Sequence, residues 1–347
     1  MLNLAAPLFK QNGIELHALS TGNNRGNYAH ALEKAGYKIH HIKFVKNPKY
    51  FWRFYKEIKK ENFDVVHIHP ERAFIWHALL AKLAGAKLIV RTVHSIFNFK
   101  GILRIKKYIA RWFARTILKV KFHSISDSVE LFEKQNFSNP TKKIYNWTDE
   151  SKFYPLTSTD EKKKIRQQIG VGEDRFVVIS VGACSPVKRH DVIIKALKTL
   201  TEKEQNIIYL HLGSGELLNE EIQLAERIGV KDYIIFAGQK ENVRDYLVAS
   251  DAFIMVSKYE GLGNTALEAA FCGLPLLVYD TYGLRDVVID GYNGILLKDL
   301  NELGEKILEL YNSPKLRKTY SENSIKLAKE KFSMEKSVID LINFYIN

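Results

Sequence analysis

Residues 260–269, with the sequence EGLGNTALEA, indicate both the architecture and the chemistry of this chain. They follow the apolar run 252–256, which is typical of a buried strand, and they lead into a segment typical of a helix. The predicted unit is therefore a strand, a glycine-bearing loop and a helix, with Glu260 in the loop and Glu268 in the helix. Backbone N–H groups at such a helix start can bind phosphate or sugar oxygens, and flanking carboxylates accept hydrogen bonds from hydroxyls.

The same ten residues also have a purely structural interpretation. Thr265 and Glu268 have the spacing of a capping box, in which their side chains satisfy the first N–H groups of the helix. Glu260 would then be an ordinary solvated acid of the loop. The functional interpretation is that the segment holds a nucleotide sugar, since such a molecule presents both phosphate and hydroxyl groups.

Short apolar runs alternate with helical patterns along the whole chain. This alternation predicts parallel sheets with crossover helices. A length of 347 residues favours two domains over one. The polar, lysine-rich segment 150–175 is the predicted junction. The predicted strands cover residues 15–19, 65–68, 88–93, 122–125, 176–181, 207–212, 233–236, 252–256 and 276–279.

Further blocks accompany the Glu260 segment in a fixed order. They are VRTVHS at 90–95, NWTDESKFYP at 146–155, VGACSPVKRHD at 181–191, LHLGSGE at 210–216 and the long block from 234 to 297. With these blocks the chain resembles the retaining glycosyltransferases of family 4, which have the GT-B fold. The resemblance implies an α/β protein with two Rossmann-like domains facing across a cleft. It implies an acceptor-side domain at 1–155, a nucleotide-sugar-binding domain at 156–333, and a last helix within 334–347 that returns to the first domain.

The resemblance also implies which residues bind the donor. Glu260 matches the acid that binds the sugar hydroxyls, Glu268 the acid that binds the ribose, and Lys188 the lysine that neutralises the diphosphate. Ala183 stands where the family often has an arginine, so neutralisation rests on Lys188, with Arg189 as a candidate helper. The implied donor-binding set also contains Gly182, Gly238, Gln239, Gly261, Leu262, Gly263, Asn264 and Thr265.

On the acceptor side, His94 matches a histidine that reaches the donor sugar near its reacting carbon. A strand-end histidine of the core is the alternative interpretation. Glu71 and Arg72 follow a predicted strand end and are expected to line the acceptor site. The implied catalytic residues are thus His94, Lys188 and Glu260. The implied reaction retains the anomeric configuration through an oxocarbenium-like, front-face displacement, in which the leaving phosphate takes the acceptor proton.

No cofactor is expected beyond the donor substrate, a UDP- or GDP-sugar. The other histidines, and the cysteines Cys184 and Cys272, show no metal-ligand spacing, so metal-free transfer is expected. Two alternatives remain open. A Rossmann-type oxidoreductase is disfavoured because Gly213-Ser214-Gly215 lacks the third glycine of the dinucleotide motif. A non-catalytic nucleic-acid or membrane-binding protein is suggested by the net charge of +13.

The positive charge is concentrated in the first domain. Residues 1–155 hold 27 Lys and Arg against 11 Asp and Glu, whereas the remainder holds 25 against 28. Residues 100–121 carry eight cations and no acid, interleaved with large apolar side chains. Such a basic amphipathic helix either lies on an anionic membrane or packs its apolar face on the domain core. The expected partners are a glycan or lipid-linked acceptor and an anionic membrane surface, with no nucleic acid, and the expected location is peripheral, at the cytoplasmic face of the membrane.

The start of the chain differs from the family pattern. Family members usually open with a strand and a Gly-Gly loop, whereas here the first residues have a helical pattern and residues 15–19 match the second strand. We expect a gap at the centre of the first sheet and a truncated or late-start form that is less stable than a longer one.

Overall fold

The computed structural model describes residues 1–346 and divides the chain into two compact units. Unit 1 comprises Met1–Trp147 and Met334–Asn347, and unit 2 comprises Thr148–Ser333. The boundary after Trp147 precedes the predicted one after residue 155. The boundary lies earlier because residues 148–155 pack on unit 2. Arg244 donates to the carbonyl of Tyr154 at 3.1 Å and stacks on the Tyr154 ring at 3.7 Å.

Unit 1 contains only parallel strands, which form two separate sheets. The smaller sheet pairs β1 (His17–Ser20) with β2 (Lys38–His41). The larger has the order β3-β4-β5-β6, with β3 (Val65–Ile68), β4 (Leu88–Val93), β5 (Lys121–Ser124) and β6 (Lys142–Lys143). Within residues 1–346 no strand joins β1 to β3, so the sheet is interrupted at the place where the sequence predicts a gap.

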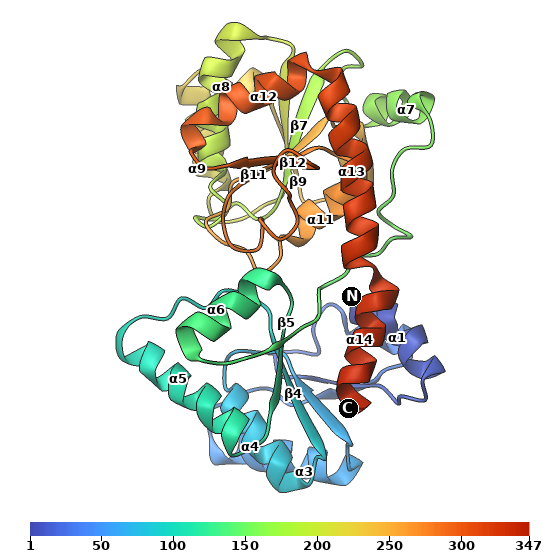
Figure 1. The fold of residues 1–347 in the computed structure, drawn as a ribbon, viewed down its shortest axis with the longest axis vertical. Coiled ribbons are helices and arrows are strands. Elements are labelled where there is room, and N and C mark those ends of the chain that lie inside the picture. Colours follow the sequence, from blue (N-terminus) through green and yellow to red (C-terminus); the bar gives the residue numbers. More distant parts are fainter. Residues whose placement is uncertain (347) are drawn as a thin grey trace. The chain divides into compact units, whose positions relative to one another are not determined.

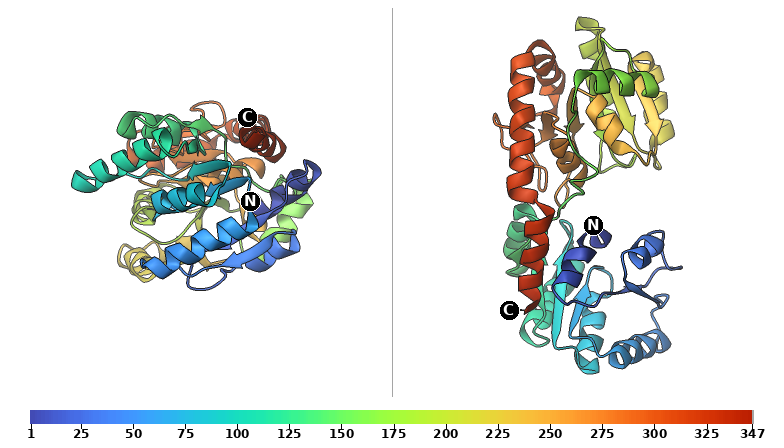
Figure 2. Two further views of the ribbon diagram at one scale, coloured as in Figure 1. Left: turned by 90° about the horizontal axis from the view of Figure 1, so that it is seen from below. Right: turned by 90° about the vertical axis from the view of Figure 1, so that its right-hand side faces the viewer.

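The helices of unit 1 alternate with these strands along the chain. They are α1 (Leu2–Gln11), α2 (Ala29–Lys34), α3 (Pro48–Glu61), α4 (Phe74–Ala84), α5 (Gly101–Thr116) and α6 (Asp127–Phe137). The last helix, α14 (Met334–Ile346), packs Val338, Leu341 and Ile342 into one apolar cluster with Ala5, Ala6 and Phe9 of α1. Figure 2 shows α1 lying against α14 in the right-hand view.

Unit 2 has one six-stranded parallel sheet in the order β12-β11-β10-β7-β8-β9. Its strands are β7 (Phe176–Val181), β8 (Ile207–Leu212), β9 (Ile234–Gly238), β10 (Ala252–Met255), β11 (Leu276–Tyr279) and β12 (Gly294–Leu297). β7 and β8 are buried almost throughout, as expected for strands covered on both faces. The chain runs outward from β7 to β9 and then returns to the other side of β7 with β10.

Helices cover both faces of this sheet (Figure 1). α8 (His190–Lys203), α9 (Leu218–Arg227) and α12 (Leu303–Asn312) contribute to one apolar core cluster with alternate strand residues such as Val178 and Tyr209. The remaining helices of unit 2 are α7 (Thr159–Ile169), α10 (Val243–Ala249), α11 (Asn264–Phe271) and α13 (Pro314–Phe332). No helix among the described residues combines the length and the apolar character needed to span a bilayer.

Candidate functional site

The candidate donor site lies at the carboxyl ends of β7 and β10. These strands are neighbours, but the chain leaves them toward opposite edges of the sheet, and ligands bind α/β sheets at such a switch point. Lys188 follows β7 and Glu260 follows β10, so two loops distant in sequence meet here. Nζ of Lys188 lies 2.7 Å from Oε1 of Glu260. Both side chains are about one-fifth exposed, which leaves the ion pair accessible to a ligand.

The start of α11 lies directly after the Glu260 loop. Gly263 is the residue preceding the helix, and it has no side chain with which to cap the first N–H groups. The hydroxyl of Thr265 donates to the carbonyl of Val181 at 3.1 Å, which ties α11 to the end of β7. The capping-box interpretation of Thr265 is therefore wrong. The N-terminal end of α11 keeps its partial positive charge for a ligand.

Two glycines allow the close approach of backbone segments at this site. A Cβ on Gly283, which has a positive φ of 82°, would lie 2.5 Å from the carbonyl oxygen of Glu260. A Cβ on Gly182 would lie 3.3 Å from Cε of Lys188, so the absence of a side chain leaves room for the lysine to fold across the end of β7. Leu262 is buried, which fixes the loop between Glu260 and α11 from within.

Glu268 lies on α11, in the second turn, and has an unusual environment for a carboxyl group. Burial raises its pKa to about 7, and the Lys152 ammonium opposes this rise. A raised pKa shows that the groups around the ionised carboxylate do not fully replace the water that burial removes. Glu268 can therefore accept hydrogen bonds from a ligand.

The remaining donor-site residues are placed as follows. Arg189 donates to the carbonyl of Val256 at 2.8 Å and stacks on Tyr279 at 4.7 Å, and its Nη2 has no partner among residues 1–346. Gly238 ends β9 with a φ of 70°, and its carbonyl accepts from the N–H of Gly213 at 3.0 Å. Gln239, beside it, is exposed.

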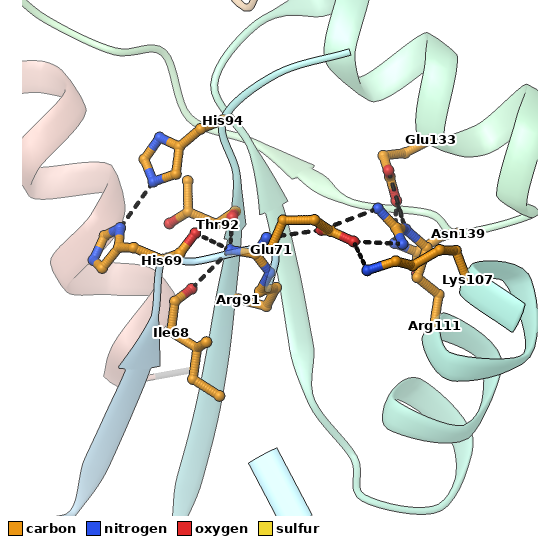
Figure 3. Close-up of polar contacts among 10 residues, drawn as sticks. All are labelled: Ile68, His69, Glu71, Arg91, Thr92, His94, Lys107, Arg111, Glu133 and Asn139. Atoms are coloured by element: carbon orange, nitrogen blue, oxygen red, sulfur yellow. Dashed lines mark hydrogen bonds and ion pairs between the residues drawn. The ribbon is translucent and has the colours of Figure 1, made fainter. Parts of the chain in front are cut away.

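His94 belongs to unit 1 and follows β4. Its Nε2 lies 2.9 Å from Nδ1 of His69, and Figure 3 shows the two rings facing each other. His94 is exposed, but the protein around its ring still reduces its hydration, and this effect, together with the Arg91 guanidinium, lowers the pKa of His94 to about 4. The pKa of His69 falls to about 3, mainly through burial. Both imidazoles are therefore neutral at pH 7 and serve as hydrogen-bonding groups.

Glu71 forms a network of ion pairs inside unit 1, as Figure 3 shows. Its carboxylate oxygens lie 3.0 Å from Arg91, 3.0 Å from Lys107 and 3.3 Å from Arg111. Arg111 also pairs with Glu133 at 2.8 Å, and both of these side chains are 1% exposed. The Glu71 carboxylate is thus held by three cations inside unit 1, and its place in the acceptor site stays a prediction.

Arg91 has a structural role that the sequence analysis does not predict. It is 1% exposed, and its guanidinium donates to the carbonyls of Ile68 and His69 and so joins the end of β3 to β4. Through His69 it also supports the position of His94. The signal was present in the block VRTVHS, since an arginine inside an apolar strand must have acceptors when it is buried.

α5 presents its apolar side chains to solvent. Ile102, Ile105, Ile109 and Trp112 recur at helical spacing and are between 47% and 73% exposed. The side of α5 that packs on the domain instead carries Arg111 and Ala114. The alternative in which the apolar face packs on the domain core is therefore wrong.

Comparisons with known proteins cover both units. The family described as "Glycosyltransferase Family 4" matches residues 3–183, and the one described as "Glycosyl transferases group 1" matches residues 161–327. An uncharacterized glycosyltransferase of Methanocaldococcus jannaschii is 31% identical over 307 residues, covering 83% of this chain and 76% of its own length. The UDP-Gal:alpha-D-GlcNAc-diphosphoundecaprenol alpha-1,3-galactosyltransferase of Escherichia coli is 28% identical over 318 residues, covering 88% and 81%.

Among solved structures, HepE of Anabaena in complex with UDP and glucose has a TM-score of 0.84 and 19% identity. The similarity covers 99% of this chain and 93% of HepE. It confirms the GT-B fold predicted from the sequence.

Proposed function

This chain belongs to glycosyltransferase family 4, and on that premise we propose that it transfers a sugar from a UDP-sugar to a lipid-linked glycan at an anionic membrane surface. The transfer of a sugar from a nucleotide-sugar donor to a glycan follows from the family. The single observation that supports the assignment of the site is the Lys188–Glu260 ion pair beside the uncapped start of α11. It combines a cation and free N–H groups for a diphosphate with a carboxylate for sugar hydroxyls.

The proposed roles follow from the chemistry of each group. Lys188 and the first N–H groups of α11 stabilise the negative charge that develops on the leaving diphosphate. Glu260 accepts hydrogen bonds from the sugar hydroxyls, and Glu268 accepts them from the ribose hydroxyls. The neutral imidazole of His94 hydrogen-bonds the reacting sugar. The leaving phosphate takes the acceptor proton, so the protein supplies positioning and charge stabilisation, and the configuration at the anomeric carbon is retained.

A uridine diphosphate donor and a lipid-diphosphate acceptor are favoured by the relatives. The E. coli relative is named for a UDP-galactose donor and a diphosphoundecaprenol acceptor, and HepE was solved with UDP and glucose. An acceptor of this kind is anchored in a bilayer, so an enzyme that uses it benefits from a surface that binds the same bilayer.

The exposed face of α5 supplies such a surface. Ile102, Ile105, Ile109 and Trp112 form an apolar stripe, and the exposed cations Arg104 and Lys106 lie on the same helix. Apolar side chains that enter the headgroup region together with flanking cations are the features of interfacial helices. Each cation near an anionic leaflet contributes about 1 kcal/mol. We therefore assign α5 as the membrane-contacting element of unit 1.

A thermal-shift screen tests the proposed donor. UDP should raise the melting temperature more than GDP, ADP or CMP at equal concentration, because a ligand that binds only the folded state stabilises it. Stabilisation by NAD(P) alone would favour an oxidoreductase. Stabilisation by oligonucleotides alone would favour a nucleic-acid-binding protein. Either of these results would reject the proposal.

A further inference from the structure

Four buried side chains converge behind the loop that carries Lys188. Cys184 lies in the loop after β7, His190 begins α8, His211 lies in β8 and Glu221 lies in α9. None of the four is more than 4% exposed. One potential ligand atom from each lies within 4.8 Å of the ligand atoms of the other three. A thiol, two imidazoles and a carboxylate are thus gathered in one small volume, which we call the tetrad.

Two distances within the tetrad are close to those between neighbouring ligands of a tetrahedral zinc site, and the other distances do not exceed 4.8 Å. Sγ of Cys184 lies 3.2 Å from Nε2 of His211, and Nδ1 of His190 lies 3.2 Å from Oε1 of Glu221. Zinc bonds of about 2.0–2.3 Å in a tetrahedron place neighbouring ligand atoms roughly 3.3–3.8 Å apart. Only small shifts of the side chains would be needed to admit the ion.

An unsatisfied carboxylate oxygen points independently to a missing ligand. Oε2 of Glu221 is buried and has no hydrogen-bond partner among residues 1–346. Leaving such an acceptor buried without a partner costs about 1–3 kcal/mol, and more if the group is charged. A cation bound by the Glu221 carboxylate would compensate the negative charge that this oxygen shares.

The surroundings hold the ligand atoms in place. Nδ1 of His211 lies 3.0 Å from Oγ of Ser180, so Nδ1 can carry the proton and leave the Nε2 lone pair directed at the tetrad. The N–H of Cys184 donates to the carbonyl of Ser214, and its carbonyl accepts from Leu217, each at 3.1 Å. A Cβ on Gly215 would lie 2.4 Å from the carbonyl oxygen of Cys184, so glycine is required for this close approach.

We propose that Cys184, His190, His211 and Glu221 bind one Zn²⁺ as a structural ion. The thiol gives up its proton on binding, so the thiolate, the carboxylate and Zn²⁺ together carry no net charge, which suits a buried site. Thiolate and imidazole ligands in a tetrahedral set favour zinc over calcium or magnesium. Four protein ligands leave no open position for a substrate, so the ion has no part in the sugar-transfer chemistry.

The tetrad gives the ion a place in the architecture of unit 2. Cys184 precedes Lys188 and His190 follows it, so the ion would clamp both ends of the loop that carries the lysine. Holding this loop to β8 and α9 fixes the position of Lys188 relative to Glu260. The tetrad has none of the paired short spacings of zinc motifs, and for that reason the sequence predicted no metal ligands.

Metal analysis and cobalt spectroscopy of the full chain test this proposal. Protein prepared without chelators, or reconstituted with ZnCl₂, should contain one zinc per chain by mass spectrometry. Replacement of zinc by Co²⁺ should give the visible bands of a tetrahedral site and a thiolate-to-cobalt charge-transfer band in the near ultraviolet. Removal of the metal by a chelator should lower the melting temperature, and ZnCl₂ should restore it.

Matched variants separate this site from other metal binding. Cys184→Ser should abolish the charge-transfer band, whereas Cys272→Ser, which removes the other buried cysteine, should retain it. Glu221→Gln keeps the shape of the side chain and should weaken zinc binding at least tenfold. A second group of potential ligands, His17, His40 and Glu61, has no thiol and cannot give that band. The proposal is overturned if the reconstituted protein binds no zinc, or if it binds metal without the band and equally well after Cys184→Ser.

Discussion

Lys188 and Glu260 form an ion pair of 2.7 Å although they are 72 positions apart in the sequence. Each satisfies the charge of the other while the site holds no donor. A diphosphate would draw the lysine away and leave the carboxylate free for hydroxyl groups. Because both side chains are partly exposed, the pair contributes at most about 1 kcal/mol to stability. Its presence is therefore better explained by ligand binding than by folding.

Removing either partner should abolish most sugar transfer and leave the fold intact. Lys188→Ala and Glu260→Ala should each lower kcat/KM roughly 30-fold to 1,000-fold, which corresponds to about 2–4 kcal/mol. Lys195→Ala is the matched control, because Lys195 forms an exposed pair with Asp191 at the same distance of 2.7 Å. A structural role would instead lower the melting temperature and leave turnover per folded molecule unchanged.

Glu268 should make donor binding depend on pH near neutrality. If the ionised carboxylate binds the ribose, the donor Kd should rise as the pH falls below about 7, the pKa of this group. Glu268→Gln should bind more weakly at pH 8 and lose this pH dependence. Calorimetric titrations between pH 5.5 and pH 8.5, a range of about one unit or more on each side of that pKa, measure both effects. A Kd in the wild type that stays constant across the range would contradict the assignment.

The raised pKa of Glu268 should also make the stability of the protein depend on pH. The pKa of Glu268 is raised from its ordinary value of 4.5 to about 7, so the folded state favours the protonated form. Protonation of Glu268 therefore contributes about 3 kcal/mol to the free energy of unfolding below pH 4.5. This contribution is lost as the pH rises through 7. Glu268→Gln should therefore be more stable than the wild type at pH 8 and nearly equal to it at pH 4.5. Urea unfolding at both pH values measures the difference.

The apolar face of α5 should control membrane binding. The double substitution Ile105→Asp and Ile109→Asp should lower the vesicle-bound fraction at least tenfold on anionic vesicles, since each isoleucine that moves from water into the bilayer contributes about 1.5–3 kcal/mol. Ile289→Asp is the control, because Ile289 is 51% exposed but belongs to unit 2. Binding should also weaken as salt rises. Equal sedimentation of the α5 variant and the wild type with vesicles would reject this surface.

Arg111 should stabilise the fold of unit 1, although it lies in the same basic helix as the exposed cations. Arg111→Ala leaves Glu133 buried without its partner and should lower the free energy of unfolding by about 3–5 kcal/mol. Arg104→Ala, at an exposed position of α5, should change it by no more than about 0.5 kcal/mol. Denaturant unfolding of the two variants provides the comparison. Similar stabilities would show that the buried pair is not formed.

The sequence predicted the parts of the fold that are long, apolar and central. Strands such as β7 and β8 were predicted at their observed bounds because both faces are buried and the apolar run is continuous. The strands β2, β6 and β12 were not predicted. All three lie at sheet edges, and the sequence of β2, Lys-Ile-His-His, carries no apolar pattern, since half of its residues are exposed.

For the candidate site, the sequence identified the residues but not their partners. Lys188, Glu260 and Glu268 stood out through motifs, whereas their pairing and the raised pKa of Glu268 depend on contacts between distant segments. The same limit applied to α5. The eight cations of residues 100–121 were evident from the sequence. Which of them are exposed depends on ion pairs with the acids Glu71 and Glu133, which lie elsewhere in the chain.

Calorimetric titration of the protein with UDP tests the central claim most directly, because it measures donor binding at the Lys188–Glu260 site without a known acceptor. The account predicts one UDP bound per chain, an affinity at least tenfold weaker in Lys188→Ala, and an unchanged affinity in the Lys195→Ala control. UDP binding with the same Kd in the wild type and in Lys188→Ala would contradict it.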